Sequence, residues 1–150
     1  MKLSNLDTLL IVEDDPDHAQ LIIDVLTEDG GLKNEIKWVS NGLKAVNYVF
    51  HEEEYNEDNA PRPGLILLDI NMPELDGFEV LRKIKGDERF RSIPVVMLTT
   101  TQNTEDVDLA LKLGANDFIV KPVQWDDFVR KIRDVGKYWV FISNSTLAKP

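Results

Sequence analysis

The sequence predicts an α/β protein built on one parallel sheet of five strands. Short apolar runs rich in Val, Ile and Leu recur along the chain, and helical apolar spacing follows each of them. Such alternation is typical of βα units laid into a single sheet. Three of the runs lack polar alternation, as expected of strands buried on both faces. The predicted strands are residues 8–12, 36–39, 65–68, 95–98 and 118–120.

The first predicted helix has clear signals at both ends. Asp15-Pro16 suits an N-cap followed by proline at the first helical position, and Gly30-Gly31 suits the helix end. Asp15 is therefore expected to be a cap rather than a metal ligand. The inward face follows the spacing i, i+3, i+4 and i+7 with Ala19, Ile22, Ile23 and Leu26.

Four further helices are predicted after the later strands, at residues 43–50, 78–85, 105–113 and 125–132. Between the second helix and the third strand, residues 51–63 predict a solvated loop. Five of the seven residues 52–58 are acidic, and two prolines follow.

Length and composition indicate one globular domain. The 150 residues include 43% hydrophobic ones, and the net charge of −10 would repel nucleic acid and anionic membranes. The absence of cysteine and of an apolar signal segment suits a cytoplasmic protein. We expect a single domain over residues 1–150, with a core at about 7–135 and an extension at 136–150.

Acidic residues directly follow two of the predicted strands. Glu13 and Asp14 come after the first strand, and Asp69 comes after the third. Ligands of open α/β sheets bind at the carboxyl ends of the strands, so these carboxylates should converge there. Because three close anions repel one another, we expect a hard divalent cation among them, and the oxygen ligands suit Mg²⁺.

Two other polar residues lie at the same predicted edge. Thr99 ends the fourth strand and Lys121 follows the fifth. A hydroxyl and an ammonium near a metal are suited to the oxygens of a transferred phosphoryl group. By contrast, His18 and His51 are expected to be exposed polar residues rather than metal ligands.

As a set, four motifs make the chain resemble the receiver domain of two-component response regulators over about residues 7–135. The motifs are LIVEDD at 10–15, LLDINMPELDG at 67–77, IPVVMLT at 93–99 and GANDFIVKP at 114–122. The resemblance implies a flavodoxin-like fold with strand order 2-1-3-4-5 and helices on both faces. It also implies a phosphoacceptor signalling protein rather than an enzyme, taking part only in its own phosphotransfer and autodephosphorylation.

The resemblance assigns the acidic residues to a phosphorylation site that needs Mg²⁺. Asp69 would be the phosphoacceptor, Asp14 a direct metal ligand and Glu13 a ligand through water. The metal would also take the backbone carbonyl of Asn71. The phosphoryl group would come from a sensor histidine kinase.

The remaining family positions concern the response to phosphorylation. Thr99 would contact the phosphoryl group after activation, and Lys121 would pair with it. Phe118 matches the switch aromatic, although a strand aromatic is equally typical of an ordinary core. Lys121-Pro122 matches a peptide bond that is cis in the family.

Two departures from a minimal receiver are similar to stand-alone regulators of phytochrome-type histidine kinases. These are the acidic insertion and a tail that contains Tyr138-Trp139-Val140-Phe141-Ile142, an apolar run suited to an interface. The turn Ser40-Asn41-Gly42 adds to this likeness. The subgroup implies a possible homodimer formed through the side of helices four and five and through the tail.

Other function classes are less well supported. A Mg²⁺-dependent aspartyl-phosphate phosphohydrolase needs a second Asp two residues after the nucleophile, where Asn71 stands. A phosphorylation-independent interaction module would not need Glu13, Asp14, Asp69, Thr99 and Lys121 together. A nucleotide enzyme is disfavoured because the chain has no phosphate-binding Gly-rich loop ending in Gly-Lys-Ser/Thr.

Overall fold

A computed structural model describes residues 8–29, 33–99 and 104–120. Its five strands are β1 (Thr8–Val12), β2 (Ile36–Val39), β3 (Pro63–Asp69), β4 (Val95–Thr99) and β5 (Asp117–Val120). The helical elements are α1 (Pro16–Asp24), the π-helical turn η2 (Val25–Asp29), α2 (Gly42–Phe50), α3 (Gly77–Lys85) and α4 (Thr104–Lys112). The alternation of strand and helix is thus the expected one.

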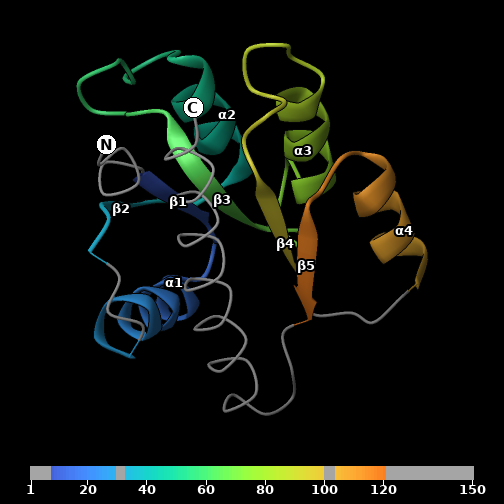
Figure 1. Ribbon diagram of the computed structural model, residues 1–150, viewed down its shortest axis with the longest axis horizontal. Coiled ribbons are helices and arrows are strands. Elements are labelled where there is room, and N and C mark those ends of the chain that lie inside the picture. The colour runs from blue at the N-terminus through green and yellow to red at the C-terminus, as the bar shows by residue number, and fades with distance from the viewer. Residues whose placement is uncertain (1–7, 30–32, 100–103, 121–150) are drawn as a thin grey trace, which may run out of the picture.

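The strands form one sheet in the order β2-β1-β3-β4-β5, with every neighbouring pair parallel. This confirms the predicted order. β1 lies between β2 and β3, with Val12 opposite Val39 on one side and Leu68 on the other. The carboxyl ends of β1 and β3 are therefore adjacent (Figure 1).

Helices cover both faces of the sheet, as predicted. Alternate residues of the buried strands point to opposite faces. One face, which includes Ile11 and Leu67, packs against Ile22 of α1 and Leu26 of η2. The other face packs against α2, α3 and Ala110 of α4 (Figure 1).

The first helix begins as the sequence predicts and changes from α-helical to π-helical form near its end. Asp15 is the N-cap, and its side chain accepts hydrogen bonds from the backbone N–H groups of Asp17 and His18. The α-helix ends at Asp24 and continues as the π-helical turn, in which the consecutive residues Val25 and Leu26 are both buried. The Gly30-Gly31 stop lies outside the described residues, as do the predicted fifth helix and the tail.

The expectation of a solvated loop at residues 51–63 is only partly correct. Its acidic side chains are exposed, but the segment is anchored to α2. The Tyr48 hydroxyl donates to the Pro61 carbonyl at 2.9 Å, and His51 Nε2 lies 2.7 Å from the carbonyl oxygen of Ala60, which is fully buried. The composition of the loop did not predict this anchoring, because the two side chains that make it, Tyr48 and His51, belong to the end of α2.

Across the part of the chain that the structure describes, no helix is long and apolar enough to cross a membrane.

Candidate metal site

The register of β1 and β3 brings Glu13 and Asp69 together. Because Val12 pairs with Leu68, the next residue of each chain segment stands at the same edge of the sheet. Ile11 and Leu67 face the α1 side, so side-chain alternation directs Glu13 and Asp69 to that side as well. The N–H of Glu13 extends the sheet by donating to the Val39 carbonyl at 3.2 Å.

Three carboxylates meet at this edge. Glu13, Asp14 and Asp69 each offer an oxygen, and these oxygens lie within 4.8 Å of one another. Glu13 is fully buried, Asp69 is 3% exposed and Asp14 is exposed. Since like charges at this distance repel, the cluster favours a bound cation.

This donor set fits a hard divalent cation. All of the ligand atoms are oxygens, and the exposure of Asp14 leaves one side open to water ligands, which Mg²⁺ characteristically keeps. Among the described residues, no other group of three His, Cys, Asp or Glu side chains comes together in this way.

The loop after Asp69 is shaped closely around it. The Asn71 N–H donates to Asp69 Oδ1 at 3.1 Å, and the Gly77 N–H donates to the Ile70 carbonyl at 3.0 Å. A Cβ atom at Gly77 would overlap the main-chain oxygen of Asp69. The glycine therefore allows the start of α3 to approach the end of β3.

Two residues that hold Glu13 were not recognised from the sequence as part of the site. His18, expected to be an exposed polar residue, is half-buried, and its Nδ1 lies 3.0 Å from Glu13 Oε1. The Trp38 indole N–H donates to the Glu13 carbonyl at 2.8 Å. For His18 the available signal was its place in the first turn of a helix that starts beside the acids.

The other predicted site residues fall into two groups. Thr99 ends β4 and is buried, one residue after the partner of Asp69 in the β3–β4 pairing. Phe118 is half-buried and packs against the cluster formed with α2 and α3, which suits the core interpretation. Lys121 and Pro122 lie outside the described residues, so their expected pairing and cis bond remain predictions.

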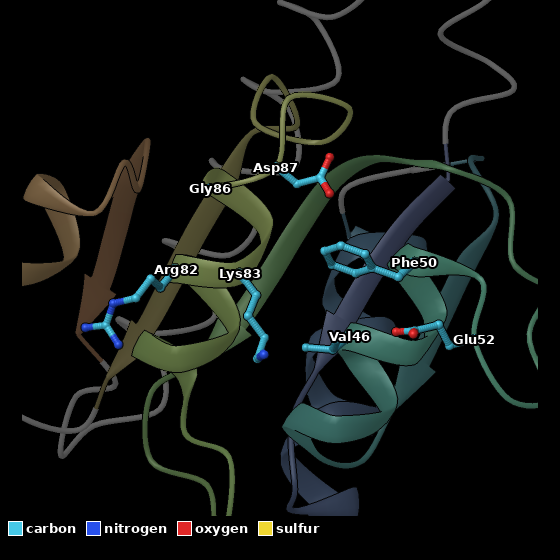
Figure 2. Close-up of a pocket in the computed structure, with 7 residues that line it drawn as sticks. All are labelled: Val46, Phe50, Glu52, Arg82, Lys83, Gly86 and Asp87. Atoms are coloured by element: carbon cyan, nitrogen blue, oxygen red, sulfur yellow. The ribbon is translucent and has the colours of Figure 1, made fainter.

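A cleft of about 550 Å³ lies at the other end of the sheet, between α2 and α3. In Figure 2, Lys83 reaches toward α2 near Val46, whereas Arg82 points away from α2. The lining includes the acidic Glu52 and Asp87 as well as these basic residues. The cleft is therefore lined by both acidic and basic side chains, whereas the carboxylate cluster contains only acidic ones.

Comparison with known proteins decides the family. A family model described as the response regulator receiver domain matches residues 9–133. The chain belongs to this family. The receiver is a signalling domain of response regulators, which interact with sensor histidine kinases.

Several relatives match the receiver over most of its length. The probable methanogenesis regulatory protein FilR2 of Methanothrix harundinacea is 36% identical over 88% of this chain and 83% of its own. Response regulator Rcp1 of Synechocystis sp. is 35% identical over 88% of both chains. The Mn(2+)-bound form of Rcp1 superposes with a TM-score of 0.83, covering 89% of this chain and 94% of that one.

The phosphorylated cyanobacterial phytochrome response regulator RcpA is equally similar in structure. It is 34% identical, with a TM-score of 0.83 over 90% of this chain and 94% of its own. The receiver is therefore similar to phytochrome response regulators in both sequence and fold.

Proposed function

We propose that the receiver accepts a phosphoryl group on Asp69 from a sensor histidine kinase, with Mg²⁺ bound at the carboxylate cluster. The observation that supports this most directly is the convergence of Glu13, Asp14 and Asp69. In this proposal Asp14 binds the cation directly, Glu13 binds it through water, and Asn71 contributes its backbone carbonyl. The solved Mn(2+)-bound relative supports a divalent metal at such a site.

The chemistry is a phosphoryl transfer between two side chains. An Asp69 carboxylate oxygen attacks the phosphorus of the kinase phosphohistidine, and the N–P bond breaks with its electron pair staying on the ring nitrogen. An acyl phosphate forms on Asp69. A bound Mg²⁺ would neutralise charge on the phosphoryl oxygens. The Asn71 N–H already donates to Asp69 Oδ1, which orients the carboxylate.

Thr99, Lys121 and Phe118 carry the response to phosphorylation in this proposal. Lys121 pairs with the phosphoryl group, and a cis Lys121-Pro122 bond would aim its ammonium into the site. Thr99 then donates a hydrogen bond to the new oxygens, and Phe118 rotates inward into the vacated space. A local change in charge would thus shift a two-state element.

The proposed kinase partner is of the phytochrome type. The similarity to RcpA and Rcp1 supports this choice, and the alternative is a kinase with another input, as suggested by the similarity to FilR2. We also propose a homodimer that uses the side of helices four and five and the tail. In its support, α4 exposes Leu109 and Leu111, which are 37% and 47% accessible.

The phosphoacceptor can be tested by incubating the receiver with a small acyl-phosphate donor and Mg²⁺, followed by intact-mass measurement. The wild type should gain the mass of one phosphoryl group in a base-labile adduct, and Asp69→Asn should gain none. Asp87→Asn, which removes an acid at the opposite end of the sheet, should behave as the wild type. An adduct that persists in Asp69→Asn would show that another residue is the acceptor.

The dimer can be tested separately by sedimentation. Removal of residues 138–150 should lower the average mass of a self-associating protein. An unchanged average mass would reject the role of the tail.

Comparing phosphotransfer from a phytochrome-type kinase with transfer from an unrelated histidine kinase would test the proposed partner, because only the cognate kinase should transfer rapidly.

A further inference from the structure

We propose that His18 is a positioning residue of the metal site, which holds the Glu13 carboxylate in place for the cation. The proposal rests on the metal site proposed above and adds a residue outside the carboxylate cluster. His18 Nδ1 lies 3.0 Å from Glu13 Oε1. Because a carboxylate only accepts hydrogen bonds, the imidazole donates through Nδ1.

The backbone that carries the histidine ring is itself held in place. The Asp15 cap fixes the start of α1, and Asp15 Oδ1 accepts the backbone N–H of His18 at 3.4 Å. On the other side of the ring, His18 Nε2 lies 3.5 Å from Asp15 Oδ2. The imidazole therefore lies between the cap of α1 and the acid at the end of β1, with its Nδ1 donor facing Glu13.

The main chain of Glu13 is fixed independently. Its N–H donates to the Val39 carbonyl, and its carbonyl accepts the Trp38 indole N–H at 2.8 Å. The backbone of Glu13 is thus tied to β2, and the freedom that remains lies in its side chain. A glutamate has more rotatable bonds than an aspartate and loses more rotamer freedom when it is fixed. The contact with His18 reduces this loss before a metal arrives.

Groups that orient metal ligands typically change metal affinity by about 10–100-fold when they are removed. Glu13 is one of several ligands and is expected to act through water, so we expect the lower end of this range. His18→Leu, which removes the donor, should weaken Mn²⁺ binding about 10-fold.

Two amide substitutions give a matched pair for this test. In His18→Asn the side-chain nitrogen occupies the place of Nδ1, beside Glu13. In His18→Gln it occupies the place of Nε2, beside Asp15. Mn²⁺ affinity, measured by electron paramagnetic resonance, should be highest in the wild type and lower in His18→Asn. It should be lowest, and equal, in His18→Gln and His18→Leu. Glutamine is a better helix former than asparagine, so the order of thermal stability should be the reverse for the amide pair.

The outcomes separate this proposal from the metal site itself. Asp14→Asn serves as the reference that removes a ligand and should lose most Mn²⁺ binding. If Asp14→Asn loses binding while the three His18 variants bind as tightly as the wild type, His18 has no positioning role. If His18→Asn and His18→Gln weaken binding equally, the position of the donor is irrelevant and the proposal is wrong. A wild type that does not bind Mn²⁺ would overturn both proposals.

Discussion

The carboxylate cluster and the segment after α3 lie at opposite ends of the sheet and arrange charge in opposite ways. At the carboxyl ends of the strands, Glu13, Asp14 and Asp69 bring three negative charges within 4.8 Å. At the other end, the segment after α3, residues 86–94, pairs an acid with a base: Arg89 donates twice to Asp87, at 2.9 and 3.0 Å. A cluster of like charges requires an external partner, whereas a matched pair does not.

The matched end is also built on aromatic rings. Phe50 of α2 and Phe90 pack edge to face with centroids 5.0 Å apart. The Arg89 guanidinium lies 4.8 Å from the centre of the Phe90 ring and 5.6 Å from that of Phe50, and Arg62 lies 5.5 Å from that of Phe90. These contacts join the end of α2 and the loop before β3 to the segment after α3, and they favour a structural role for this region.

The largest expected effect comes from a substitution beside the carboxylate cluster. Gly77→Ala would place a methyl group against the main-chain oxygen of Asp69 and the Cα of Ile70, both of which are backbone atoms. We expect a loss of about 3 kcal/mol in the free energy of unfolding, at the upper end for overpacking. Urea denaturation measures this loss, and an unchanged midpoint would show that the loop moves aside easily.

Replacement of Asp by Asn should change the free energy of unfolding in opposite directions at the two ends of the sheet. Without divalent metal, Asp69→Asn should raise the free energy of unfolding by about 1 kcal/mol, because it relieves repulsion in the cluster. Asp87→Asn should lower it, because it removes the partner of Arg89.

Bound metal should reverse the effect of Asp69→Asn on stability. In wild type, Mg²⁺ at about 100 times its Kd should add about 2.7 kcal/mol of stability, and Asp69→Asn should lose most of that gain. Thermal melts with Mg²⁺ and with chelator measure both effects. A destabilised Asp69→Asn in chelator would contradict our view of the cluster.

A smaller effect is expected at the anchored loop. Tyr48→Phe removes the hydrogen bond to the Pro61 carbonyl and should cost about 1 kcal/mol. Burial, with the charge of Glu35 adding to it, raises the pKa of Tyr48 well above its ordinary value. The neutral form therefore stabilises the fold below the ordinary pKa, and this contribution is lost as the pH rises beyond it. Tyr48→Phe should accordingly weaken the dependence of stability on alkaline pH.

The smallest effect is a shift in one titration. Hydrogen bonds from Arg89 hold the pKa of Asp87 below its ordinary value of 3.8. The pairing therefore stabilises the fold above that pH and is lost as the pH falls through the lowered pKa. In Arg89→Gln, the Asp87 carboxyl resonance followed by NMR should titrate closer to the ordinary value. An unchanged midpoint would show that the pair is not formed in solution.

Much of the fold and of the carboxylate cluster is predictable from the sequence. The strand at residues 8–12 has the expected limits because a parallel strand buried on both faces is a nearly continuous apolar run. The cluster is predictable because Glu13 and Asp69 directly follow two of the apolar runs in the sequence. Once those strands are neighbours, the acids must meet.

The contacts around Glu13 are not predictable in the same way. They depend on how far α1 and β2 lie from β1 in space, and no local pattern in the sequence encodes that distance. From the sequence, His18 is expected to be an exposed helical residue. The sequence predicts Trp38 to lie in a strand but does not indicate which face of the sheet it occupies. The aromatic corner of Phe50 and Phe90 joins segments 40 positions apart and has no periodic signal.

Trp38 gives the receiver a built-in optical reporter. The residue is 42% exposed and its indole N–H donates to the Glu13 carbonyl, so its emission should respond to the local electric field and to solvent when the neighbouring carboxylates are neutralised. The chain has two other tryptophans, Trp125 and Trp139. Replacing both with phenylalanine would leave a single emitter, and occupancy of the site could then be followed by fluorescence without an added label.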